Sequence, residues 1–201
     1  MEHLFTENNE VNQLLEIFYT KVIPFEFAKK KSIDSDGKVI DIDFVLDKIL
    51  LLKDVDSKSV EIINSVVKKH MFKVIDSKLA LKQFDIVDSY FEKIRQAGFD
   101  TPQFILDYAV KRYADELKNL NGDLRYTTDS SGLNLIKELI CKGNLEAIYI
   151  YALLYKNQRN LMAYFELIKY AAQRGHKQSI ERLQESGESF SDNPSGIEKW
   201  L

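Results

Sequence analysis

The chain contains few of the residues that cross-link or interrupt a fold. Its 201 residues include one cysteine, three prolines and eight glycines. The single cysteine, Cys141, excludes an internal disulfide, which is typical of a protein from a reducing compartment. Few prolines and glycines argue against a many-turned β-sandwich and favour helices. We therefore predict an all-α protein, and a chain of this length buries enough surface to fold without a disulfide or a metal.

The chain also lacks the charge and the hydrophobic runs that direct proteins to nucleic acid or to membranes. Its formal net charge is −3, and its densest basic run, at 29–31, has no aromatic residues interleaved. The longest apolar runs, such as AIYIYALLY, are far too short to span a bilayer. The first residues are acidic and polar, where a signal peptide needs a basic start and an apolar core. We expect a cytoplasmic protein with no nucleic-acid or membrane partner.

Motifs for catalysis and metal binding are absent from the sequence. It contains no phosphate-binding loop, no dinucleotide glycine pattern and no nucleophile elbow. His3, His70 and His176 are far apart, and none stands at the spacing of a metal-binding helix. We interpret His70 as a cation near a helix end, His176 as an exposed residue and Cys141 as a small buried apolar residue. These absences predict a protein that is not an enzyme and binds no cofactor or metal. Residues distant in sequence can still meet, so a helical enzyme is an alternative.

Apolar residues recur at helical spacing along most of the chain. Pro24 follows the first such stretch, while Thr101 and Pro102 are suited to the cap and first position of a central helix. Gly98 ends the helix before it. The predicted helices cover about 11–22, 44–53, 57–74, 81–97, 102–120, 133–142, 145–156, 161–174 and 178–185. Because 57–74 is rich in β-branched residues, a strand is an alternative there.

Two short elements recur in the second half of the chain. IKELICKGN at 136–144 matches IKYAAQRGH at 168–176 in an isoleucine, a lysine, a basic residue and a glycine. AVKRYADEL at 109–117 and AIYIYALLY at 147–155 share two alanines and a tyrosine at the same spacing, and SIERL at 179–183 is a partial copy. These positions fall on one helix face, where small residues let a second helix approach. A glycine then supplies the left-handed turn to the next helix, which predicts a stack of helix pairs.

These elements resemble the Sel-one-like repeat, a relative of the tetratricopeptide repeat, over about 104–183. The resemblance is carried by Ala-x-x-x-Tyr-Ala-x-x-Tyr and Ala-Ala-x-x-Gly. The chain departs from the repeat in the short turn KNQRN after Tyr155, and in Leu167 and Ile168, where an aromatic residue is usual. The resemblance implies an N-terminal helical region, 1–98, that caps the stack, then the repeats, 99–186, and a tail, 187–201. An unrelated helical bundle is the alternative.

The resemblance also implies a binding surface, because such repeats usually bind proteins or peptides on the concave face formed by the first helix of each pair. In this sequence that face lies opposite the alanine and tyrosine stripe of 147–155. The candidate partner-binding residues are Tyr108, Arg112, Glu146, Tyr149, Leu153, Lys156, Gln178, Glu181 and Glu185. The alternative is that Tyr149 and Leu153 are buried under the N-terminal half.

A protein-binding role is therefore the expected function. A small acidic chain of this kind resembles bacterial immunity proteins, which neutralise a toxin by stoichiometric binding. Glu146, Glu181 and Glu185 would suit a basic toxin such as a nuclease. The alternatives are a regulatory adaptor or scaffold with several weaker partners, a calcium-responsive switch and the helical enzyme. Neither the partner nor the oligomeric state follows from the sequence.

The calcium alternative rests on the run SIDSDGKVIDID at 32–43. It has the length of a calcium loop, with Gly37 at the sharp turn. Its carboxylates at ligand positions are Asp34, Asp36 and Asp43. However, the run begins with Ser32 rather than an aspartate and ends without a bidentate glutamate. The competing interpretation is a polar loop or small hairpin in which Asp41 or Asp43 caps the next helix.

The tail ends in GIEKWL, which carries the chain's one tryptophan. We expect Trp200 and Leu201 to dock on the protein's own surface, and the alternative is that they form a short peptide for a partner.

Overall fold

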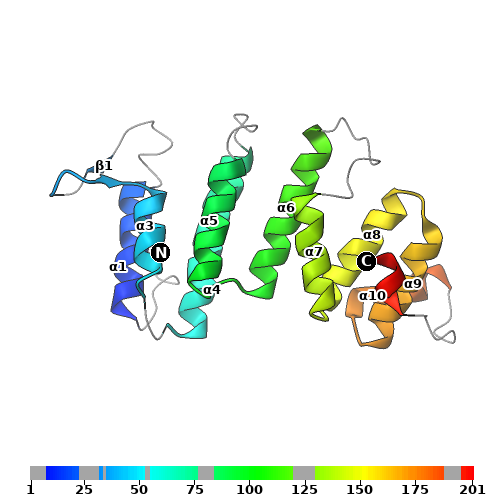
Figure 1. Cartoon of the computed structure of the whole chain (residues 1–201). Coiled ribbons are helices and arrows are strands. Elements are labelled where there is room, and N and C mark those ends of the chain that lie inside the picture. The colour runs from blue at the N-terminus through cyan, green and yellow to red at the C-terminus, as the bar shows by residue number, and fades with distance from the viewer. Residues whose placement is uncertain are drawn as a thin grey trace. The chain divides into compact units, whose positions relative to one another are not determined.

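The computed structural model describes residues 8–22, 32–33, 35–52, 55–76, 84–119, 130–187 and 196–201. Within these residues the protein is all-α, as predicted: it has nine α-helices, and the β-structure is a single hairpin of two-residue strands (Figure 1). The chain divides into two compact units, Met1–Phe104 and Ile105–Leu201. Each unit is described by itself below.

The first unit, as far as it is described, consists of four α-helices and a π-helical turn. Its elements are α1 (Asn9–Ile17), η2 (Phe18–Val22), β1 (Ser32–Ile33), β2 (Val39–Ile40), α3 (Ile42–Ile49), α4 (Ser57–Asp76) and α5 (Phe84–Gln96). Asn8 caps α1 by accepting the backbone N–H groups of Glu10 and Val11. Residues 57–74 are helical, so the strand alternative is wrong. Tertiary packing of an amphipathic face outweighs the weak preference of β-branched residues for strands.

The core of the first unit is made of apolar side chains at helical spacing, and it includes a histidine. Phe18, Leu46 and Ile94 are among its fully buried residues. His70 is also buried, with its ring edge-on to Phe18 at a centroid distance of 5.5 Å. Our interpretation that His70 lies near a helix end is therefore wrong, because α4 continues beyond it and turns this position toward the core.

The segment that suggested a calcium loop is a hairpin. Strands β1 and β2 pair antiparallel, and Gly37 between them has a φ of 79°. The Asp41 side chain caps α3 by accepting the N–H of Phe44 at 3.0 Å, while the Asp43 carboxylate accepts from Lys93 at 2.8 Å. Asp34 lies outside the described residues. In the part of the chain that is described, no three histidine, cysteine, aspartate or glutamate side chains are placed to hold a metal.

The second unit contains consecutive helices joined by short turns. Its elements are α6 (Pro102–Asn119, from Ile105 onward), α7 (Ser131–Cys141), α8 (Leu145–Asn157), α9 (Leu161–Gln173), α10 (Lys177–Ser186) and the 3-10 helix η5 (Ile197–Trp200). From α7 to α10, each helix packs against the next one in sequence. The side chain of Thr101 caps α6 by accepting the N–H of Phe104 at 3.3 Å, as predicted.

Three turns of the second unit are built alike. In each turn a residue in the left-handed conformation ends one helix, and the next residue caps the following helix. The left-handed residues are Gly143, Arg159 and Gly175, with φ of 79°, 62° and 88°, and the caps are Asn144, Asn160 and His176. Arg159 adopts this conformation without being a glycine, at a cost of about 1 kcal/mol. The turn KNQRN thus repeats the geometry of the two glycine turns, although its sequence differs.

Small residues allow the helices of this unit to pack closely. Ala147, Ala163 and Ala171 are completely buried on α8 and α9. Helix α7 approaches the backbone of α6 closely at Gly132, where an added Cβ would lie 2.5 Å from the Tyr113 backbone nitrogen. Cys141 follows the buried Ile140 at the end of α7 and is exposed, so our expectation that it is buried is wrong.

Candidate functional site

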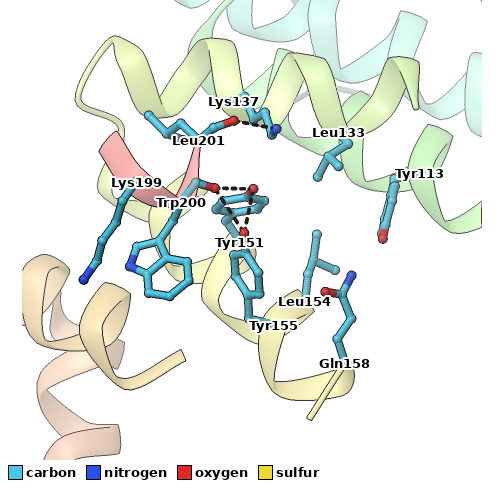
Figure 2. A pocket seen from close by; sticks show the side chains of 10 residues that line it. All are labelled: Tyr113, Leu133, Lys137, Tyr151, Leu154, Tyr155, Gln158, Lys199, Trp200 and Leu201. Carbon is cyan, nitrogen blue, oxygen red and sulfur yellow. Dashed lines mark hydrogen bonds between the residues drawn. The ribbon is translucent and has the colours of Figure 1, made fainter. Parts of the chain in front are cut away.

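A cavity of about 300 Å³ lies in the second unit, where α6, α7 and α8 meet the end of the described chain (Figure 2). Helix α6 contributes Tyr113, α7 contributes Leu133 and Lys137, and α8 contributes Leu154 and Gln158. Residues 199–201 close one side. We call this cavity and its walls the α8 groove. Its lining is mostly apolar or aromatic with a few polar groups, which is the usual composition of a binding site.

Residues 196–201, which we call the docked segment, are held at the α8 groove through their backbone. The Trp200 carbonyl accepts hydrogen bonds from the hydroxyls of Tyr151 and Tyr155, at 2.7 and 3.1 Å. The Lys137 ammonium donates to the main-chain oxygen of Leu201 at 2.7 Å. Figure 2 shows these donors converging on the segment from α7 and α8. Because the acceptors are main-chain groups, these contacts hold a peptide backbone whatever its sequence.

Side chains of the docked segment make a second set of contacts, with α9. The Trp200 indole N–H donates to the Glu166 carboxylate at 2.8 Å, and the Lys199 ammonium contacts the same oxygen at 2.7 Å. The Trp200 ring lies 5.7 Å from that of Tyr155 in an edge-on arrangement, and Ile197 is buried. The expectation that Trp200 and Leu201 dock on the protein's own surface is confirmed.

The groups that hold the docked segment keep the protonation states that these contacts need. Burial, followed by the hydrogen bond with Tyr155, raises the pKa of Tyr151, so its hydroxyl stays a donor. The hydrogen bond from Lys199 lowers the pKa of Glu166, assisted by the Trp200 indole and opposed by burial. Glu166 is therefore a charged acceptor at neutral pH.

The lowered pKa of Glu166 makes docking dependent on pH. A carboxylate whose pKa is lower in the docked state stabilises that state above its ordinary pKa, about 4.3, and loses this contribution as the pH falls below it. We expect the emission maximum of Trp200, the only tryptophan, to shift to longer wavelength as the pH falls below about 4.3. Glu166→Gln should remove the transition. The far-UV circular dichroism must stay unchanged over the same pH values, because unfolding would also shift the emission. A red shift of equal size in Glu166→Gln would contradict the prediction.

The residues that we proposed for partner binding do not line the α8 groove. Tyr108 and Tyr149 are buried, so the expectation that they are exposed on a concave face is wrong. Arg112 is also largely buried, with 14% of its side chain exposed, and it pairs with Glu116 on the same helix. Helix α8 carries buried residues around most of its circumference, so its sequence does not distinguish an open face.

Tyr149 is buried within the second unit, by residues at and after the start of α10. Its ring lies 5.1 Å from that of His176, and its hydroxyl accepts weakly from Arg182 at 3.5 Å. His176 Nε2 lies 2.9 Å from the carboxylate of Glu146, so Glu146 is engaged inside the chain as well. His176 has 10% of its side chain exposed, and our expectation that it is exposed is wrong. These contacts join α8 to α10 and serve packing.

The same histidine forms a carboxylate–imidazole–hydroxyl series like that of a hydrolase. His176 Nδ1 lies 2.9 Å from the Ser179 hydroxyl, while Nε2 faces Glu146. However, Ser179 is completely buried, and its backbone N–H also donates to Nδ1 at 3.3 Å. This geometry is that of a helix cap, which fixes the ring proton on Nε2, toward Glu146.

The remaining candidates lie at or near the surface. Leu153 is half-buried, and the exposed Lys156 places its ammonium 5.2 Å from the ring centre of Tyr164. Gln178, Glu181 and Glu185 are exposed on α10. Glu181 lies 4.0 Å from Lys177, and Glu185 pairs with Arg182 at 3.0 Å.

The sequence contained one signal for the α8 groove that we did not use. Tyr151 and Tyr155 stand one helical turn apart in the alanine and tyrosine stripe, and we assigned that whole stripe to the interior. Two hydroxyls at this spacing project from the same helix face. Such a pair needs hydrogen-bond partners, and here they are on the docked segment.

A scan against protein-family models found no match to this chain, and searches of curated proteins and of solved structures returned no similar protein. Among the described helices, none combines the length and the apolar character needed to cross a membrane.

Proposed function

We propose that this protein is a non-enzymatic protein-binding protein that receives a segment of its partner in the α8 groove. The observation that carries this proposal is that a length of polypeptide is already bound there, with its main-chain oxygens held by Tyr151, Tyr155 and Lys137. A surface that binds main-chain carbonyls with side-chain donors suits a peptide better than a small substrate.

The rest of the groove supports the same role. Leu133, Leu154 and Tyr113 provide an apolar and aromatic surface for a partner's side chain, as the centres of protein interfaces do. Gln158 is exposed at the groove and offers an amide for orientation. The evenly spaced turns before α8, α9 and α10 are compatible with a helical-repeat scaffold, and the resemblance to Sel-one-like repeats remains part of this proposal.

The partner class that we propose is the toxin of an immunity pair, and it rests on the resemblance stated above. The charges of the three candidate glutamates support a basic toxin less than we expected, because each has a partner in the chain. The pairs are Glu146 with His176, Glu181 with Lys177 and Glu185 with Arg182. The pairs of Glu181 with Lys177 and of Glu185 with Arg182 join opposite charges at the surface and leave little net charge for steering. The Glu146 carboxylate is held by the imidazole N–H of His176 and keeps its charge. Apolar and main-chain contacts in the groove are the stronger basis for recognition.

The groove is tested by affinity capture from a lysate of the source organism with two matched variants. Leu154→Arg places a charge on the half-buried groove wall, whereas Leu161→Arg makes the same change at a leucine that is 53% exposed on α9 and outside the lining. We expect a partner captured by the native chain to be reduced at least tenfold with Leu154→Arg and retained with Leu161→Arg. A loss of about 1.4 kcal/mol in binding corresponds to this factor.

The pattern of capture also separates the possible roles. One dominant partner at near-equal stoichiometry fits the immunity role, and co-expression with that partner should then protect cells from it. Several weak partners fit an adaptor or scaffold. Equal capture by Leu154→Arg and by the native chain would contradict the groove as the binding site, provided that both variants keep the native circular dichroism.

A further inference from the structure

We propose that the docked segment, residues 196–201, is an intramolecular ligand of the α8 groove, and that the partner segment that displaces it carries a basic residue followed by tryptophan. This inference rests on the proposed function and names the chemistry of the partner.

Recognition of side chains is concentrated at Glu166. One of its oxygens accepts both the indole N–H of Trp200 and the ammonium of Lys199. An acceptor with a negative charge selects a cation and a ring N–H donor over neutral aliphatic or acidic side chains. The Glu166 side chain is only 26% exposed, so an acidic residue placed beside it would be strongly disfavoured. The partner segment must therefore present a basic residue next to a ring with an N–H group.

The docked segment does not fill the site that it occupies. A cavity of about 300 Å³ remains beside Trp200 and Leu201, walled on the other side by Tyr113 and Leu133. Figure 2 shows the side chains of Tyr113, Leu133 and Leu154 on the side of this space away from the docked segment. A partner that presents the same contacts and places a further apolar side chain in this space gains burial that the docked segment lacks.

The docked segment is also held by few buried groups, which makes exchange feasible. Ile197 is buried, but Lys199 and Glu198 are exposed and Trp200 is half-buried. Its helix η5 has four residues and lacks a side-chain cap. An intramolecular ligand of this kind lowers the apparent affinity for a competing segment. The apparent affinity equals the intrinsic affinity multiplied by the fraction of time that the groove is open.

The test uses a fluorescein-labelled peptide of sequence GIEKWL and the full chain carrying Trp200→Ala. This change removes the indole contact of the docked segment and leaves the groove walls that come from α6, α7 and α8 unchanged. If the docked segment fills the native groove nine-tenths of the time, Trp200→Ala should bind the peptide about tenfold more tightly than the native chain. A control peptide with glutamate in place of its lysine should bind at least tenfold more weakly, and Trp200→Ala combined with Glu166→Gln should lose the preference between the two peptides.

Binding is measured by fluorescence anisotropy, with circular dichroism to confirm that each variant is folded. Absence of saturable binding to folded Trp200→Ala would overturn the inference. So would equal affinity of both peptides. Saturable binding with the expected preference supports it. Exchange of the segment between two copies of the chain, seen as a dimer in sedimentation that Trp200→Ala abolishes, would identify a second copy as the occupant and overturn the assignment to a partner.

The capture experiment distinguishes this inference from the proposed function. If the captured partner depends on Leu154, increases with Trp200→Ala and is eluted by the GIEKWL peptide, both are supported. If it depends on Leu154 but responds neither to Trp200→Ala nor to the peptide, the protein-binding function stands and the displacement is wrong. If no captured protein depends on Leu154, the proposed function fails, and the inference fails with it.

Discussion

Gly132→Ala is expected to lower the free energy of unfolding by about 3 kcal/mol, the upper end of the range for overpacked positions. The new Cβ would lie 2.5 Å from the Tyr113 nitrogen and 2.6 Å from the Ala109 oxygen. Both are backbone atoms, so no side chain can move aside to relieve the contact. Helix α7 must instead shift away from α6, which loosens the packing around Gly132. Urea unfolding followed by circular dichroism measures the loss.

Gly143→Ala is the matched control for this prediction. Gly143 has a φ of 79°, but nothing lies within 4 Å of an added Cβ there. Its substitution should cost only the strain of the left-handed conformation, about 1 kcal/mol. If Gly132→Ala lowers the free energy of unfolding no more than Gly143→Ala does, the backbone of α6 does not come as close to Gly132 as the geometry indicates.

Leu183→Ala is expected to cost about 3 kcal/mol, within the range observed for buried leucines. Helix α10 has two buried residues, Ser179 and Leu183, and both are completely buried. Leu183 is therefore the large apolar anchor that holds α10 against α9. Its truncation leaves a cavity that the short helix cannot refill. Urea unfolding measures the loss, and hydrogen exchange should show α10 opening before α8 and α9.

Gln184→Ala provides the control on the same helix. Gln184 is exposed beside Leu183, and alanine is at least as good a helix former, so the change should stay within about 0.5 kcal/mol. Equal losses for the two variants would mean that helix propensity, rather than burial of Leu183, determines the stability of α10.

The helices were predictable because their signals are local. Apolar spacing located the nine described α-helices, and the Thr101–Pro102 pair marked the start of α6. Caps and left-handed turns depend on residues that are adjacent in sequence, so glycine at 143 and 175 was informative. The turn at Arg159 was harder to interpret, because a non-glycine residue adopts the same conformation only when the surrounding helices hold it there.

The candidate site was less predictable because burial depends on which helices meet. Tyr149 and Leu153 are neighbours on one face of α8, yet Tyr149 is buried while Leu153 is only half-buried. Tyr149 contacts His176 and Arg182, which are distant from it in sequence. Helical periodicity gives the direction of a side chain from its own helix and does not report what lies opposite.

The sequence by itself predicted that this protein is all-α and where along the chain its α-helices lie, and it favoured docking of the last residues on the chain. Each of these follows from local spacing, from capping residues or from apolar side chains that must leave water. Only the tertiary structure decided which surfaces remain open. It placed Glu166, Tyr151, Tyr155 and Lys137, from three different helices, around one short segment. This convergence is not visible in the sequence. Contacts between helices depend on the packing of the whole unit, so the sequence of a single helix carries no periodic pattern that reports them.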